Sequence, residues 1–211
     1  MVQRWIIAST NKKKIREIRE ILTQLGIELL TMDDVPDLEE PDETGSTFAE
    51  NARIKARAVS EVTGLPTVAD DSGLEVDALG GRPGVYSRRY SEDGTDASNN
   101  AKLLAELQGI SRRSARFRCA IVWIDGEEEQ LFDGTCEGTI LHAPRGENGF
   151  GYDPLFAPDG MGGRTMAELT PAEKNAISHR GRALEGLKRW TRARGAATGA
   201  APDGAGASTD G

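Results

Sequence analysis

Two adjacent carboxylates, Asp70 and Asp71, follow a short apolar stretch at residues 67–69. Carboxylates at the end of a buried strand are costly to desolvate unless a cation or a hydrogen-bond donor lies close to them. Ligands of α/β sheets bind beyond the carboxyl ends of the strands. Two acids there could hold Mg²⁺ or Mn²⁺ and orient or deprotonate a water molecule. The alternative is a simple aspartate-rich turn formed with Ser72 and Gly73.

A second candidate segment lies at residues 9–14, where a predicted strand meets a predicted helix. A helix N-terminus offers unpaired N–H groups and a partial positive charge, and both favour a phosphate. The residues that would add donors and positive charge are Ser9, Thr10, Asn11, Lys12, Lys13 and Lys14. A capped helix with solvated lysines would account for the same residues, and the sequence contains no G-x-x-x-x-G-K-[ST] phosphate loop.

Two later segments could contact a nucleobase. Residues 149–154 read G-F-G-Y-D-P, and aromatic rings interleaved with glycines allow a flat ring to stack while the backbone comes close. Core packing or a plain turn would account for these residues equally well. Residues 173–180 read E-K-N-A-I-S-H-R. They place Lys174, His179 and Arg180 on or just beyond one helix face, where they could bind phosphates and base edges or simply face solvent.

Composition excludes several other functions. Two cysteines and two histidines give neither a disulfide framework nor a zinc spacing, so any metal must be held by carboxylates, as Mg²⁺ or Mn²⁺ usually is. The net charge of −8 argues against a nucleic-acid binder, although not against a small anionic substrate. The apolar runs are too short to cross a bilayer and the N-terminus does not resemble a signal peptide. We therefore predict a cytoplasmic protein with no membrane partner.

The elements that must position these residues follow from the apolar periodicity. A strand over residues 4–9, a helix from Asn11 to Gly26 and a strand over residues 27–32 form a strand–helix–strand unit, which indicates an α/β fold. An acidic loop over residues 33–43 precedes a helix over residues 47–63. The residues predicted to face inward from that helix are Phe48, Ile54, Ala58 and Val62.

The rest of the chain predicts further strands and helices around the candidate residues. We expect the strand at residues 67–69 to end at the paired aspartates, with a turn before a second extended stretch at 74–79. The remaining predicted elements are a helix over 95–108, hairpin strands over 115–124 and 130–140, a glycine-rich loop over 146–163 and one helix over 171–192. We expect a single domain over residues 1–193 and a disordered Gly/Ala-rich tail over residues 194–211.

Taken together, these segments resemble the inosine/xanthosine triphosphate pyrophosphatase family from Trp5 to about Trp190. The matching motifs are T-N-K-K-K at 10–14, E-T-G-S-T-F-A-E-N-A at 43–52, A-D-D-S-G-L-E-V-D-A-L-G-G-R-P-G at 69–84, G-F-G-Y-D-P-L-F at 149–156 and E-K-N-A-I-S-H-R at 173–180. The first motif departs from the family pattern, because Thr10 leads directly into Asn11 without the usual glycine and Lys13 stands where glycine is frequent.

The resemblance implies Mg²⁺-dependent hydrolysis of non-standard purine nucleoside triphosphates (ITP, dITP and XTP) to the monophosphate and pyrophosphate by a homodimer. It implies that Asp71 is the general base and a metal ligand, with Glu43 as a second metal ligand and Asp70 beside them. Lys55 is similar to the family's active-site lysine. The residues that would bind the nucleotide are Ser9, Thr10, Asn11, Lys12, Lys13, Lys14, Ser72, Phe150, Gly151, Tyr152, Asp153, Lys174, His179 and Arg180. We expect a long, twisted mixed β-sheet with flanking helices and two lobes around a central cleft.

Two alternative functions stay open. A pyrophosphatase for modified pyrimidine nucleotides would also need lysines and carboxylates on an α/β scaffold, but the G-F-G-Y-D-P and S-H-R segments argue against it. A module that binds nucleotides without hydrolysing them is the other alternative. The dense carboxylates beside the candidate phosphate site argue against that one, because without a metal they would repel the ligand.

Overall fold

A mixed sheet forms the centre of the protein. The structure, a computed structural model, describes residues 3–36 and 38–198. In this part of the chain the sheet strands are β1 (Arg4–Ile7), β2 (Glu28–Thr31), β3 (Thr67–Val76), β4 (Ser114–Asp125), β5 (Glu128–Ile140) and β6 (Phe156–Pro158). Their order is β2-β1-β3-β4-β5-β6, with β1 parallel to β2 and β3 and the other neighbours antiparallel. The predicted mixed α/β sheet is confirmed.

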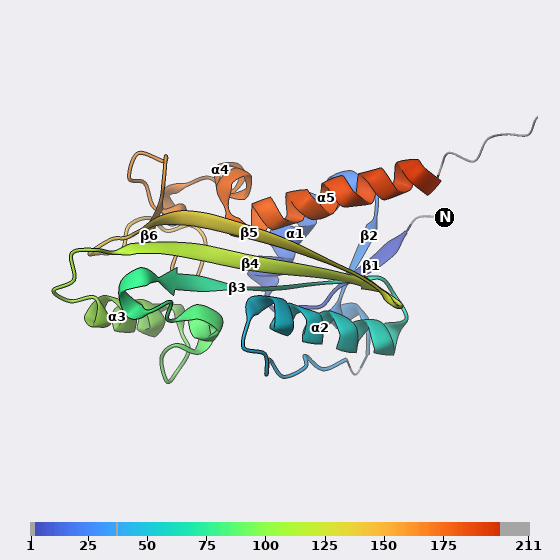
Figure 1. Cartoon of the computed structure of the whole chain (residues 1–211), viewed down its shortest axis with the longest axis horizontal. Helices are drawn as coiled ribbons and strands as arrows, with labels where there is room; N and C mark the ends of the chain where they lie inside the picture. The colour runs from blue at the N-terminus through green and yellow to red at the C-terminus, as the bar shows by residue number, and fades with distance from the viewer. Residues whose placement is uncertain (1–2, 37, 199–211) are drawn as a thin grey trace, which may run out of the picture.

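Helices cover both faces of this sheet (Figure 1). The helices are α1 (Lys12–Leu22), α2 (Phe48–Thr63), α3 (Asp96–Glu106), α4 (Pro171–Ile177) and α5 (His179–Thr198). Apolar side chains of α1 and α5 pack on one face of the sheet, and those of α2 pack on the other. None of the helices in residues 3–36 and 38–198 is long and apolar enough to span a membrane.

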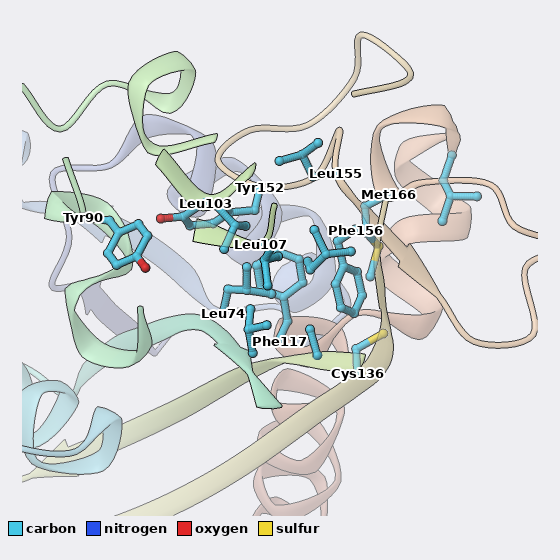
Figure 2. Close-up of a cluster of buried hydrophobic side chains, with 14 residues drawn as sticks. Leu74, Tyr90, Leu103, Leu107, Phe117, Cys136, Tyr152, Leu155, Phe156 and Met166 are labelled. Carbon is cyan, nitrogen blue, oxygen red and sulfur yellow. The ribbon is translucent and has the colours of Figure 1, made fainter. Parts of the chain in front are cut away.

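A separate hydrophobic cluster lies at the end of the molecule away from β1 and β2, and Figure 2 shows it in close-up. It joins the far halves of β3, β4 and β5 to α3 and to the segment that follows the hairpin. The side chains at its centre include Leu74, Leu103, Phe117, Cys136, Tyr152 and Phe156. Because β3, β4 and β5 run through both ends of the molecule, they join two lobes with separate cores, as predicted.

Helix α2 forms where a helix was predicted, but the side chains that face inward differ from the prediction. Thr47 caps its N-terminus in a capping box with Glu50, and Gly64 ends it with φ 63°. Val62, predicted to face inward, is 70% exposed, whereas Asn51 and Lys55 are 0% and 2% exposed. The helix can bury these two polar side chains because both find charged or polar partners in the cavity described below.

Strand β3 does not end at the paired aspartates, so the prediction of a turn there is wrong. Residues 67–76 form one continuous strand, and every residue pairs with β4. The long antiparallel partner supplies backbone hydrogen bonds across the Asp-Asp-Ser-Gly segment, which overrides its local turn preference. Gly73 is needed for packing, since a Cβ at this position would lie 2.5 Å from Gly84 O and 2.9 Å from Phe48 Cε1.

The single helix predicted over residues 171–192 is in fact two helices. The backbone is extended at Ser178 (ψ 156°), where α4 ends and α5 starts. Ser178 Oγ accepts a hydrogen bond from Gly181 N–H at 3.0 Å and so satisfies a backbone donor in the first turn of α5. At its other end α5 continues to Thr198, so residues 194–198 are helical although the sequence assigned them to the tail. Residues 199–211 lie outside the described residues.

Candidate active site

A cavity lies between the two lobes, just beyond the end of β1. β1 pairs with β3 only at two residues, Ile6 and Ile7, so β3 continues past it along the cavity. The predicted residues that line the cavity are Ser9, Asn11, Lys14, Glu43, Lys55, Asp71, Ser72, Phe150, Gly151, Tyr152, Asp153, Lys174, His179 and Arg180. The structure therefore brings together residues from all the segments that the sequence singled out. Thr10, Lys12 and Lys13 are not part of this lining.

Asp70 and Asp71 point to opposite faces of the sheet because neighbouring side chains alternate along a strand. Asp70 is fully buried on the face covered by α1 and α5. Its Oδ2 lies 3.0 Å from Arg180 Nη2 and 3.3 Å from Lys14 Nζ. Burial alone would raise the pKa of Asp70, but these cations hold it well below its usual range. Asp70 is therefore a permanent anion that fixes two cations.

Asp71 faces α2 and opens into the cavity. Its Oδ2 accepts a hydrogen bond from Asn51 Nδ2 at 3.1 Å, and its Oδ1 lies 3.8 Å from Lys55 Nζ. Lys55 Nζ also donates to Glu43 Oε1 at 2.7 Å, so one ammonium group connects the two carboxylates. Burial raises the pKa of Asp71 above its usual value in spite of Lys55 and Lys14. Such a carboxylate is a better proton acceptor than an exposed one.

The start of α1 forms the part of the cavity predicted to bind phosphate. Asn11 Oδ1 caps the helix by accepting hydrogen bonds from Lys13 N–H at 3.0 Å and Lys14 N–H at 3.2 Å. Among the three lysines only Lys14 turns inward, since residues of one helical turn point in different directions. Lys12 is exposed, and Thr10 donates a hydrogen bond to Glu40. The cap thus orients one lysine and one asparagine toward the cavity.

A buried ion network joins α1, α4 and α5 beside the cavity. Lys174 Nζ lies 2.9 Å from Glu17 Oε1 and 2.7 Å from Asp153 Oδ2, and Arg180 pairs with Glu17 through Nη1. Burial would lower the pKa of Lys174, but Asp153 and Glu17 raise it, so the ammonium group stays charged. Glu17 is not among the residues predicted from the sequence. Its position next to the buried Ile18, on the inward side of α1, was the available signal.

Aromatic side chains form another part of the cavity lining. The Phe150 ring centroid lies 4.7 Å from Lys174 Nζ, and the His179 ring stacks on Phe117 with centroids 4.8 Å apart and planes 14° from parallel. Burial lowers the pKa of His179 well below its usual value, so the ring is neutral. Its Nδ1 is buried and has no hydrogen-bond partner among the described residues. This part of the lining therefore offers aromatic rings, with the cations of Lys174 and Arg180 close to Phe150.

Several further residues line the cavity that the sequence did not indicate. They come from the acidic loop, the short helical segment after β3, helix α3 and β4, and they are Glu40, Val85, Ser87, Arg88, Asp96, Asn99 and Phe117. No motif marks them, because only the packing of the second lobe brings them next to the cleft. Among the described residues no group of three or more His, Cys, Asp or Glu side chains is arranged to hold a metal ion.

Comparison with known proteins identifies the family of this chain. The Ham1 family pattern matches residues 5–190. The chain is 53% identical to the dITP/XTP pyrophosphatase of Geobacillus kaustophilus over 88% of this chain and 93% of that protein, and 54% identical to the one of Nocardia farcinica over 87% and 92%. A HAM1 protein structure from Coxiella burnetii superposes with a TM-score of 0.82 at 46% identity, covering 91% of this chain and all of that chain. The chain belongs to the Ham1 family.

Proposed function

We propose that this chain hydrolyses the non-standard purine nucleoside triphosphates ITP, dITP and XTP to the nucleoside monophosphate and pyrophosphate. The observation that carries the proposal is the arrangement within one cavity of a buried carboxylate of raised pKa, Asp71, an inward lysine, Lys14, and the aromatic ring of Phe150. The similarity to proteins named dITP/XTP pyrophosphatase supports this choice of substrate.

The cavity also supplies oxygen ligands that suit Mg²⁺. Mg²⁺ is usually held by one or two carboxylates together with water molecules and substrate phosphates, so a preformed cluster of three protein ligands is not required. Glu43 and Asp71 are the two cavity carboxylates that share Lys55 as a partner, and Lys55 holds them next to each other. When bound there, Mg²⁺ would neutralise charge on the phosphate oxygens. Mn²⁺ has similar ligand preferences and could replace it.

The proposed reaction is attack of water on the α-phosphorus. Asp71 orients a water molecule and accepts its proton while a bond forms between the water oxygen and phosphorus. The bond between the α-phosphorus and the oxygen that bridges to the β-phosphate breaks, and pyrophosphate leaves with that oxygen. Lys14 and Lys55 stabilise the negative charge that spreads over the phosphate oxygens. Lys174 and Arg180 each bridge two buried carboxylates other than the proposed base and metal ligand, so we assign them to holding the walls of the site in place.

Selectivity for inosine and xanthosine rests on the oxygen at C6 of the purine. Adenine carries an amino group there, so a site that presents hydrogen-bond donors would leave that group facing other donors. Mismatched buried polar groups can give roughly 10⁴-fold discrimination. The neutral His179, whose ring lines the cavity, is the donor we assign to this contact.

The proposal includes a cytoplasmic homodimer that clears these nucleotides from the pool and binds neither nucleic acid nor membrane. The family resemblance supports the dimer, and the net charge of −8 supports the absence of nucleic-acid binding. Light scattering coupled to gel filtration would measure the oligomeric state directly.

Incubation of the purified protein with separate nucleotides tests the function. We expect pyrophosphate release from ITP, dITP and XTP in the presence of Mg²⁺, little release from GTP, ATP and TTP, and none after chelation with EDTA. Orthophosphate as the sole product would reject attack at the α-phosphorus. Hydrolysis of modified pyrimidine triphosphates in preference to ITP would favour the pyrimidine alternative, and tight binding without turnover would favour a nucleotide-binding module.

A further inference from the structure

The turn that carries Phe150 is held from the side of helix α3 by two side chains. Asp96 is the first residue of α3, and Asn100 lies four residues later on the same face of the helix. Asp96 Oδ2 accepts a hydrogen bond from Gly151 N–H at 2.9 Å, and Asn100 Nδ2 donates one to Gly151 C=O at 2.9 Å. One helix face therefore fixes both backbone polar groups of the residue that follows Phe150.

Two other contacts hold Phe150 and Tyr152, the residues on either side of Gly151. Tyr152 donates its hydroxyl to Ser87 C=O at 2.8 Å, and Asp153 Oδ2 accepts from Phe150 N–H at 2.8 Å. The middle of the turn depends on the contacts from α3. Within the described part of the chain, the Asn100 side chain makes one hydrogen bond, the one to Gly151, and its Oδ1 is buried without a partner.

Asp96 also faces helix α1 across the mouth of the cleft. Its Oδ2 lies 3.7 Å from Lys13 Nζ, and the two side chains are 55% and 52% exposed. Solvent screens an ion pair of this kind, so it contributes little. The hydrogen bond from Gly151 N–H to Asp96 is the contact that can position Phe150. The negative charge of Asp96 has a different effect, because it repels an anion that binds near Lys13.

We propose that Asp96 and Asn100 are positioning residues for the purine base, because they fix the Gly151 peptide groups and thereby the direction of the Phe150 ring. The proposal rests on the proposed function, since it takes the base to stack on Phe150. Contacts to the base are remote from the reacting phosphorus and equally strong in the ground and transition states. Their loss raises KM and leaves kcat unchanged.

Four variants separate the hydrogen bond from the charge. Asp96→Ala removes both, Asp96→Asn keeps an oxygen acceptor for Gly151 N–H while removing the charge, and Asn100→Ala removes the second contact. Glu92→Gln is the control, because it removes one exposed carboxylate from the same lobe without touching the turn. Steady-state kinetics with ITP and Mg²⁺ give KM and kcat, and inorganic tripolyphosphate, which lacks a base, serves as a competitive inhibitor of the phosphate end.

We expect the KM of Asp96→Ala for ITP to exceed that of Asp96→Asn about three- to tenfold, which is the range for one lost hydrogen bond. We expect kcat and the tripolyphosphate Ki to be the same in these two variants. We expect Asn100→Ala to have a higher KM for ITP than the wild type. Glu92→Gln should have the wild-type KM.

Equal KM values for Asp96→Ala and Asp96→Asn would overturn the proposal, as would a fall in kcat at unchanged KM, which indicates a purely structural role. A wild-type protein that does not hydrolyse ITP would instead refute the proposed function. Calorimetric Kd values for ITP in the same variants do not depend on turnover, and the three- to tenfold difference between Asp96→Ala and Asp96→Asn is expected there as well.

Discussion

Gly134 in β5 controls how closely helix α5 can approach the sheet. A methyl group at this position would lie 2.8 Å from Ala183 N and 3.0 Å from the carbonyl carbon of His179, and closer still to the His179 carbonyl oxygen. These are backbone atoms, so no side-chain rotation relieves the overlap. The start of α5 would have to move by more than about 1 Å to restore ordinary van der Waals distances. His179 and Arg180, the first two residues of α5, would move with it.

We therefore expect Gly134→Ala to reduce both activity and stability. A displacement of about 1 Å in residues that position the substrate can cost about 10²-fold in rate. Overpacking of this kind destabilises a protein by about 1–3 kcal/mol. The assays are kcat/KM for ITP and urea unfolding monitored by circular dichroism, both on the purified full-length chain.

Gly186→Ala is the matched control on the same interface. There the added methyl group would meet a ring carbon of Phe132 at 3.3 Å, and that side chain can shift. Replacing a glycine within a helix by alanine also favours the helix by up to about 1 kcal/mol. We expect near wild-type kcat/KM in this variant. Wild-type kcat/KM in folded Gly134→Ala, or an equal loss in both variants, would refute the argument from backbone contact.

Two further variants test the chemistry of the site. Asp71→Asn should lower kcat for ITP about 10²-fold or more, since general-base groups contribute at least that much, and retention of more than about a tenth of the activity would reject Asp71 as the base. His179→Gln should flatten the pH dependence of stability. Burial holds the pKa of His179 well below its usual value of 6.5, so below that pH the unfolded chain takes up a proton that the folded protein does not, and wild-type stability falls as pH decreases. Urea unfolding at pH 7.5 and 5.5 should show a wild-type slope steeper by at most about 1.4 kcal/mol per pH unit, and equal slopes in the two proteins would contradict a buried neutral His179.

Local signals in the sequence were sufficient for most individual elements. The Thr47 cap and the Gly64 stop define α2 because they satisfy backbone groups within a few residues of themselves. The turn at Gly126 likewise joins the two hairpin strands, β4 and β5. Features of this kind depend on neighbours in the sequence, so sequence alone can predict them.

Predictions failed where distant segments decide the local structure. The Asp-Asp-Ser-Gly segment favours a turn by itself, but a partner strand more than 40 residues away keeps it extended. Asn51 resembles a solvated helix residue until Asp71 is placed beside it, and only the family motif indicated Lys55. Glu17 is similar, because its partners Lys174 and Arg180 lie at the far end of the chain. Whether a charged helix residue is buried or solvated therefore cannot be predicted from local sequence without knowledge of the fold.

The continuity of β3 explains how two adjacent aspartates can have different roles. In a turn, both carboxylates could face the same ligand, and their mutual repulsion would raise at least one pKa. In a strand, Asp70 meets Arg180 and Lys14 on one face, while Asp71 meets Asn51 and Lys55 on the other. The pKa of Asp70 is accordingly lowered and that of Asp71 is raised. The strand thus separates a fixed anion that organises cations from a carboxylate that can accept a proton, and only the second opens into the cavity.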